Sequence, residues 1–252
     1  MENSDVVKLE DVSVHYGGIP ALEGVNLTVK QDDFIGIIGP NGGGKTTLLR
    51  VILGLVKPTA GKVTVIGEPP EGGRRHIGYV AQYNLFDRSF PASVFEVALM
   101  GRLRQSGLFH PYRQVDKEAV IQALETVEML GMKDRHIGEL SGGQQQRVFV
   151  ARALVTEPRV LLLDEPMASV DPTMQTTFYE LLEQLKKKMA IIMVSHDIGA
   201  VSIYVDKIAC LNRHLFYHDS KEITTEELES VYQCPVEMIA HGVPHRVLKE
   251  HK

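Results

Sequence analysis

The alternation of apolar and polar residues predicts a β-rich N-terminal region. Residues 6–14 alternate in this way, which is typical of a half-buried strand, and residues 21–29 are expected to form a second strand. Residues 34–38 are apolar apart from one glycine, as expected of a strand buried on both faces. Short strands are also predicted over residues 62–66 and 76–81.

The pattern changes to helical spacing in the middle of the chain. Residues 93–102 and 117–131 carry apolar side chains at helical intervals, so a mostly helical insertion is expected between about residues 84 and 157. Beyond it, strands and helices alternate again, which favours an α/β fold. The predicted elements are a helix at 144–154, a strand at 160–163, a helix at 174–188, a strand at 189–194, a closing strand pair at 207–211 and 215–217, and a short helix near 224–227.

A phosphate-binding loop lies between the strand at 34–38 and a predicted helix at 47–53. Residues 39–46 match the pattern G-x-x-x-x-G-K-[ST], in which glycines let backbone N–H groups point at phosphate oxygens. The lysine would reach the β- and γ-phosphates, and the hydroxyl beside it would bind Mg²⁺. The residues of this predicted site are Gly39, Pro40, Asn41, Gly42, Gly43, Gly44, Lys45, Thr46 and Thr47.

Composition narrows the class of protein. The chain has 252 residues, 44% of them hydrophobic, which suits one large α/β domain. Its formal net charge of −5 gives no reason to expect nucleic acid as a partner. Only Cys210 and Cys234 occur, so no disulfide framework is expected. No signal peptide or membrane span is indicated, so a membrane process would need another subunit to supply the pore.

Polar side chains follow the predicted buried strands. Asp164 and Glu165 come directly after residues 160–163, at the sheet edge where ligands of α/β proteins bind. Asp164 is placed to hold Mg²⁺, and Glu165 to polarise an attacking water. His196 and Gln82 also follow strands; His196 could donate to the γ-phosphate, and Gln82 could contact Mg²⁺ or the water. Tyr16 could stack on an adenine ring or simply pack.

A second anion site is predicted at the start of the helix at 144–154. Ser141 and Gln144 have capping-box spacing, and Gly142 and Gly143 lie between them. A helix N-terminus of this kind attracts phosphate. The chain therefore carries two phosphate-binding loops but only one with a lysine. Either one chain binds two nucleotides, or two chains share them.

Together these motifs resemble those of ATP-binding cassette (ABC) ATPases over residues 16–196. The matching segments are an aromatic base platform, the Walker A loop, the Gln loop, the signature Leu-Ser-Gly-Gly-Gln, the Walker B strand with its glutamate, and the switch histidine. Residues 168–171 correspond to the D-loop, with Val170 in place of the commoner leucine and Asp171 as a further nucleotide-site residue.

The resemblance implies the fold and the mechanism. It implies a RecA-like α/β core, an N-terminal antiparallel β subdomain and an inserted α-helical subdomain, all in a single ATP-binding domain over residues 1–252 with a tail at about 234–252. It also implies that two copies meet head to tail with ATP and Mg²⁺ between them. The residues Lys45, Thr46, Asp164 and Glu165 of one copy would then face Ser141 and Gly143 of the other, and Thr46, Gln82 and Asp164 would contact the metal.

A narrower resemblance concerns the cargo. Residues 90–102 and 166–171 resemble cassettes of importers for divalent metals, with zinc the first expectation and manganese the second. The implied partners are a second copy, transmembrane permease subunits and, through the permease, an extracellular metal-binding protein. The chain would lie on the cytoplasmic face of the membrane without a span of its own. Transport of another solute, or a soluble non-transport role, is the alternative.

The tail offers one separate candidate for a metal site. Cys234, His241 and His245 have a spacing that could bind zinc. Three loosely spaced ligands do not make a site, and an exposed tail tolerates histidine, so an ordinary tail is the favoured interpretation.

Overall fold

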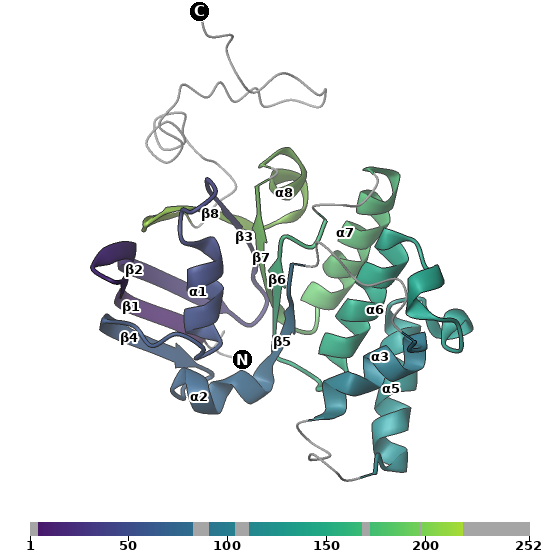
Figure 1. Ribbon diagram of the computed structural model, residues 1–252. Coiled ribbons are helices and arrows are strands. Elements are labelled where there is room, and N and C mark those ends of the chain that lie inside the picture. The colour runs from purple at the N-terminus through teal and green to yellow at the C-terminus, as the bar shows by residue number, and fades with distance from the viewer. Residues whose placement is uncertain (1–4, 83–90, 104–110, 168–171, 197, 219–252) are drawn as a thin grey trace, which may run out of the picture.

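The computed structural model describes residues 5–82, 91–103, 111–167, 172–196 and 198–218. Its described strands form a three-stranded sheet and a six-stranded sheet, and helices cover them in layers (Figure 1). Strands β1, β2 and β4 lie on one flank with helix α1, and the helices α3, α5, α6 and α7 lie on the other. The α/β class, with a separate N-terminal antiparallel sheet, is as predicted.

The small sheet places an aromatic side chain at a hairpin tip. Its strands β1 (Asp5–Tyr16), β2 (Ile19–Lys30) and β4 (Ala60–Val65) pair antiparallel in the order β2-β1-β4. Gly17 and Gly18 join β1 to β2 with φ values of +56° and +84°, the left-handed conformation that a two-residue hairpin turn requires. Both strands are longer than predicted, and Tyr16 therefore ends β1 at the tip of the hairpin.

The large sheet aligns the ends of its parallel strands. Its order is β5-β6-β7-β3-β8-β9, and only the β8–β9 pair is antiparallel. Because the carboxyl ends of parallel strands meet at one edge, residues that follow β3, β5, β6 and β7 are brought together there. The strands are β3 (Phe34–Ile38), β5 (Ile77–Val80), β6 (Val160–Asp164), β7 (Ala190–Ser195), β8 (Lys207–Asn212) and β9 (His214–His218).

The central strands are apolar because both faces of the sheet are covered. Alternate side chains of β3 enter two separate cores: Phe34 and Ile38 belong to the core that also contains side chains of α6 (Gly142–Leu154), α7 (Pro172–Lys186) and α8 (Ile198–Tyr204). Ile35 and Ile37 pack with α1 (Lys45–Ile52) and the small sheet. A strand buried in this way shows a continuous apolar run rather than alternation.

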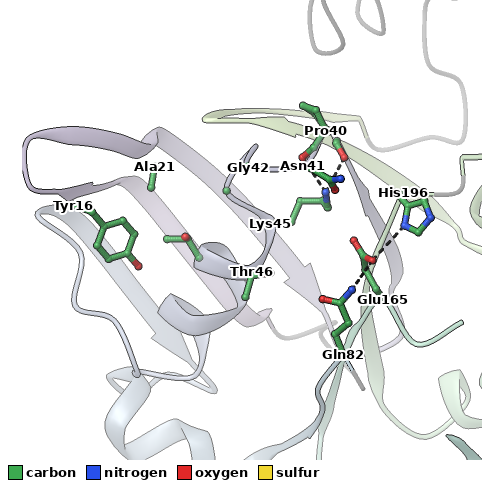
Figure 2. Close-up of a pocket in the computed structure, with 13 residues that line it drawn as sticks. Tyr16, Ala21, Pro40, Asn41, Gly42, Lys45, Thr46, Gln82, Glu165 and His196 are labelled. Carbon is green, nitrogen blue, oxygen red and sulfur yellow. Dashed lines mark hydrogen bonds and ion pairs between the residues drawn. The ribbon is translucent and has the colours of Figure 1, made fainter. Parts of the chain in front are cut away.

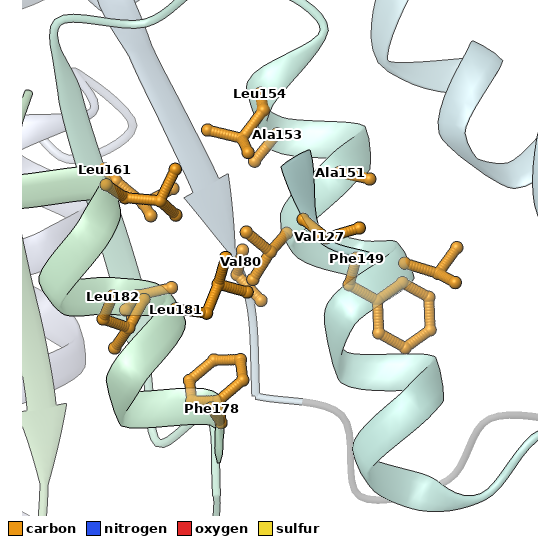
Figure 3. Close-up of a cluster of buried hydrophobic side chains, with 14 of the residues drawn as sticks. Val80, Val127, Phe149, Ala151, Ala153, Leu154, Leu161, Phe178, Leu181 and Leu182 are labelled. Carbon is orange, nitrogen blue, oxygen red and sulfur yellow. The ribbon is translucent and has the colours of Figure 1, made fainter. Parts of the chain in front are cut away.

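Helices α3 (Val94–Leu99), α5 (Gln114–Thr126) and α6 make up the helical layer predicted from the sequence. Val80 of the large sheet and Phe178 of α7 lie among the side chains of the cluster that joins this layer to the sheet (Figure 3). A buried ion pair between Arg102 Nε and Asp116 Oδ1, at 2.9 Å, adds a polar link within the layer. Its partner Asp116 is fully buried and also accepts the backbone N–H of Arg113 at the start of α5.

Several predicted boundaries were wrong. Helix α1 begins at Lys45 rather than at residue 47, so the helix starts directly from the phosphate loop. Helix α5 begins at Gln114, three residues before the predicted start at 117, because Asp116 accepts the N–H of Arg113. It ends at Thr126, five residues before the predicted end at 131.

Among the described residues, two short α-helices were missed. They are α2 (Pro70–Gly73) and α8 (Ile198–Tyr204), which contain four and seven residues and so show too little periodicity to be detected. The helix expected near 224–227 and the candidate ligands Cys234, His241 and His245 lie outside the described residues. Within the part of the chain that is described, no helix has the length and apolar character needed to cross a membrane.

Candidate functional site

The phosphate loop curls tightly between β3 and α1. Gly44 has φ +98°, which side chains rarely permit, and it lies at the first position before the helix. A Cβ on Gly39 would lie 2.0 Å from the carbonyl oxygen of Leu211, so only glycine allows this approach. The turn between β8 and β9 holds the loop from outside, since Arg213 N donates to the Gly43 carbonyl at 3.0 Å.

Lys45 lies inside this loop. Its Nζ donates to the carbonyl oxygens of Gly39 at 2.8 Å and Pro40 at 3.0 Å, and the residue is only 7% exposed. Burial lowers the pKa of Lys45, while the negative charges of Glu165 and Asp164 act in the opposite direction. A cation held in this environment is poorly hydrated, and an anion entering the loop would add to the countercharge of the two carboxylates.

The two carboxylates after β6 have different surroundings. Asp164 is 3% exposed, and burial raises the pKa of its carboxyl group, although hydrogen bonds from Tyr79 and Thr46 oppose the rise. The Tyr79 hydroxyl donates to Asp164 Oδ2 at 3.3 Å. Glu165 has a positive φ of 46°, an uncommon conformation for a residue with a side chain, and lines the cavity described below.

Two side chains from neighbouring strand ends meet at the Glu165 carboxylate. Gln82, which follows β5, donates its Nε2 to Glu165 Oε2 at 3.0 Å. His196, which follows β7, places its Nδ1 3.3 Å from the same oxygen (Figure 2). The parallel order β5-β6-β7 puts these three chain positions side by side, although residues 82 and 196 are far apart in the sequence.

These residues line one cavity of about 650 Å³. Tyr16 lies at one end of it and His196 at the other, with the phosphate loop between them (Figure 2). Tyr16 is 47% exposed, so its ring is available for stacking. The lining consists of Tyr16, Ala21, Gly39, Pro40, Asn41, Gly42, Gly44, Lys45, Thr46, Thr47, Gln82, Glu165 and His196.

The second predicted anion site is elsewhere. Ser141 and Gln144 form the predicted capping box at the start of α6, with Ser141 N donating to Gln144 Oε1 at 3.0 Å and Gln144 N donating to Ser141 Oγ at 3.3 Å. Ser141 and Gly142 are exposed, whereas Gly143 packs closely against Met174 of α7. None of these signature residues lines the cavity.

The structure therefore does not bring the two loops together in one chain. Of the other predicted site residues, Asp171 lies outside the described residues. Two neighbours of the site were missed by the sequence reasoning, Ala21 in the cavity wall and Tyr79 beside Asp164. For Tyr79 a signal existed: it lies in the strand that leads to Gln82, and polar atoms near a strand end of a parallel sheet tend to face the site.

Comparison with known proteins identifies relatives along most of the chain. The family model described as "ABC transporter" matches residues 22–168. The zinc uptake system ATP-binding protein ZurA of Listeria innocua is 43% identical over 220 residues, covering 85% of this chain and 86% of that protein. The manganese transport system ATP-binding protein MntB of Listeria monocytogenes is 37% identical over 240 residues, covering 94% of this chain and 100% of that protein.

Solved structures agree with this relationship. A nucleotide-free ATP-binding cassette from an ABC transporter superposes with a TM-score of 0.79 at 27% identity, covering 92% of this chain and 96% of the other. The dimeric structure of a bacterial ABC transporter cassette gives a TM-score of 0.70 at 29% identity, covering 86% of this chain and 100% of the other. Both share the layered fold described above along most of their length.

Proposed function

This chain belongs to the family of ABC transporter ATP-binding proteins, and we propose that it powers a membrane importer of divalent transition metal ions. As a member of this family it binds nucleotide and is an ATPase whose activity is coupled to transport. Relatives named for zinc uptake and for manganese transport support the choice of cargo, with zinc first and manganese second.

ATP would occupy the cavity from end to end. The adenine ring would stack on Tyr16, and the phosphates would lie in the loop of residues 39–44 at the N-terminus of α1. Lys45 would exchange the carbonyls of Gly39 and Pro40 for the β- and γ-phosphates. This exchange replaces neutral acceptors with charged ones, so nucleotide binding would relieve the unfavourable burial of the Lys45 ammonium group.

The cavity also offers a suitable set of ligands for Mg²⁺. The Thr46 hydroxyl hydrogen-bonds to the buried Asp164 carboxylate, so two oxygen ligands of the kind that Mg²⁺ prefers lie together next to the phosphate loop. Gln82 would add its amide oxygen. When bound, Mg²⁺ would neutralise part of the charge that develops on the phosphates.

Glu165 is the proposed general base for hydrolysis. Its Oε2 accepts a hydrogen bond from Gln82 and lies beside His196, so two neighbouring side chains restrict the orientation of the carboxylate in the cavity. Glu165 would take the proton from that water as its oxygen attacks the γ-phosphate, while His196 would donate a hydrogen bond to a γ-phosphate oxygen. The convergence of Gln82 and His196 on Glu165, in the same cavity as Lys45, is the observation that supports this assignment most directly.

A second copy of the chain would complete the site. Ser141 is exposed, and neither Ser141 nor the more buried Gly143 lines the cavity of its own chain, so a head-to-tail dimer would place Ser141 and Gly143 against the γ-phosphate held by the partner. A cassette with the same fold is known in a dimeric structure. ATP would close the dimer because it contacts both halves, and hydrolysis would release it.

The other partners follow from the transport function. The chain would dock on transmembrane permease subunits at the cytoplasmic face of the membrane, and an extracellular metal-binding protein would deliver the cargo to the permease. The cassette would not contact the metal cargo itself. An ABC transporter for another solute is the alternative, because the cargo is selected by these partners.

The test is a pull-down from solubilised native membranes with the Glu165→Gln chain, combined with metal analysis of a deletion strain. A co-purifying multi-span protein, together with depletion of zinc or manganese in the strain, is the expected result. A membrane partner with unchanged cellular metals would keep the transporter and remove the metal assignment. The absence of any membrane partner would contradict the transport function.

A further inference from the structure

Strand β5 and the segment that follows it contact the two carboxylates at the end of β6. The Tyr79 hydroxyl donates to Asp164 Oδ2 at 3.3 Å, and Gln82 Nε2 donates to Glu165 Oε2 at 3.0 Å. Strands β5 and β6 are parallel neighbours, with Tyr79 paired to Leu162 and Val80 paired to Leu163. Gln82 follows β5 and Glu165 follows β6, so the second contact lies just beyond the paired strands. Strand β5 and the segment after it therefore provide one hydrogen bond to each carboxylate.

The contact with Asp164 is formed where water has little access. Asp164 is 3% exposed, and burial raises the pKa of its carboxyl group, so each hydrogen bond to the charged form matters more than it would in water. The Tyr79 ring is half-buried and packs against the core that contains Leu162. Phenylalanine would fill the same space without a hydroxyl, so the packing alone does not account for the polar group placed at the carboxylate.

We infer that Tyr79 is a positioning residue for the divalent cation: its hydroxyl fixes the orientation of the Asp164 carboxylate in which that group and Thr46 bind the metal together. The inference rests on the magnesium site proposed above. A partner that orients a metal-binding carboxylate typically changes metal affinity by about 10–100-fold when it is removed. Because Gln82 follows β5 only two residues after its last residue, Val80, a movement of β5 would disturb the metal-binding carboxylate and the general base together.

The test compares Tyr79→Phe with the wild-type full chain in two binding measurements. Mn²⁺ binding in the presence of ADP is followed by electron paramagnetic resonance, and ADP binding in EDTA is measured separately. Tyr204→Phe is the matched control, since it also removes one hydroxyl from a half-buried ring. The ring of Tyr204 stacks on that of Tyr179, with 4.3 Å between the ring centroids. The expected result is about a tenfold weaker affinity for Mn²⁺ in Tyr79→Phe alone, with ADP binding in EDTA unchanged in both variants.

A spectroscopic measurement on the wild-type chain does not depend on the variant folding. The chain has eight tyrosines and no tryptophan, so a change in the surroundings of one tyrosine hydroxyl is visible in the near-ultraviolet difference spectrum. Adding Mg²⁺ to the ADP complex is expected to produce a tyrosine difference signal, and Tyr79→Phe is expected to lose it while Tyr204→Phe retains it.

Three results would overturn the inference. Equal Mn²⁺ affinity in Tyr79→Phe and wild type would make Tyr79 a packing residue. An equal loss of ADP binding with and without metal would mean that the hydroxyl shapes the whole pocket. If the wild-type chain itself bound ADP no better with Mn²⁺ than in EDTA, the proposed magnesium site would fail together with the inference.

Discussion

The two loops predicted to bind anions both lie at helix N-termini, yet their surroundings differ. The phosphate loop before α1 is concave, lies in a cavity of about 650 Å³ and encloses the buried Lys45. The signature loop before α6 is exposed at Ser141 and Gly142 and lies outside that cavity. Its capping box satisfies the backbone N–H groups of Ser141 and Gln144. The first loop has most of a ligand site around it, whereas the second offers only one surface of a site.

The two loops also differ in the cost of the charges that they bury in the nucleotide-free chain. Around the phosphate loop, burial lowers the pKa of Lys45 and raises that of Asp164, so both charges are held at a cost that a ligand would relieve. The signature loop has no such buried charge, and the capping box makes it stable without a ligand.

Replacing Glu165 with glutamine should have the largest effect. The variant keeps the contacts of the phosphate loop but loses the base, so turnover should fall by about 10²–10⁴-fold while ATP still binds. Phosphate release and gel filtration with ATP measure the two properties, and a trapped dimer is expected. A chain that stays monomeric with ATP would contradict the shared site.

Lys45→Ala should act on the phosphate loop alone. Hydrogen bonds to charged groups contribute about 1.5–3 kcal/mol, so affinity for ATP should fall by about 10- to 150-fold. The free chain should lose little stability, because the buried ammonium group is itself costly. Nucleotide titration and thermal melting measure the two effects. An unchanged ATP affinity would show that Lys45 stays bound to the carbonyls of Gly39 and Pro40.

Ser141→Ala should act on the shared surface alone, and Ser93→Ala is its control. Ser93 forms the same kind of capping box with Glu96 at the start of α3, so both variants should lose about 1 kcal/mol of stability. Only Ser141→Ala should weaken ATP-dependent dimerisation, by about 10- to 100-fold, because only Ser141 is proposed to meet a phosphate. Sedimentation in the Glu165→Gln background measures this, and an equal effect of both variants would reduce Ser141 to a cap.

Mixing Lys45→Ala with Ser141→Ala chains should restore activity in part. In a head-to-tail heterodimer both defects fall in one site and the other site is intact. Random pairing makes about half of the dimers mixed, so the activity of the mixture should reach about a quarter of the wild-type value. If both loops acted within one chain, the mixture would be no more active than its components.

Asp164→Asn should change the stability of the nucleotide-free chain only slightly, and the change should be an increase. The pKa of Asp164 is higher in the folded chain than its usual value of 3.8, so the folded state holds the proton more tightly. The free energy of unfolding of the wild type should then fall as the pH rises from about 3.8 through the higher pKa of the folded chain, and the variant should lose this dependence. At neutral pH its melting temperature should rise by about 2–4 °C while metal-dependent ADP binding is lost. A lower melting temperature would show that the charge stabilises the free chain.

Many elements could be predicted because their signals are local. The apolar run at 34–38 and the capping pair Ser141 and Gln144 depend on neighbours a few residues away, and the structure places them as predicted. The boundaries of α5 failed for the opposite reason, since Asp116, buried against Arg102, fixes the start of that helix. Helix α8 was too short to show a period of its own.

Local sequence patterns were enough to predict the chemistry of the site: a lysine in a glycine-rich loop, two carboxylates after an apolar strand, and a glutamine and a histidine after two other strands. Which of these side chains meet depends on the tertiary fold. The order β5-β6-β7 places Gln82 and His196 on the same oxygen of Glu165, brings the unpredicted Tyr79 to Asp164, and leaves Ser141 outside the cavity. The reason is physical. A motif is recognised from residues that are close together in the sequence, whereas contacts between strand ends depend on the order and register in which distant segments pair.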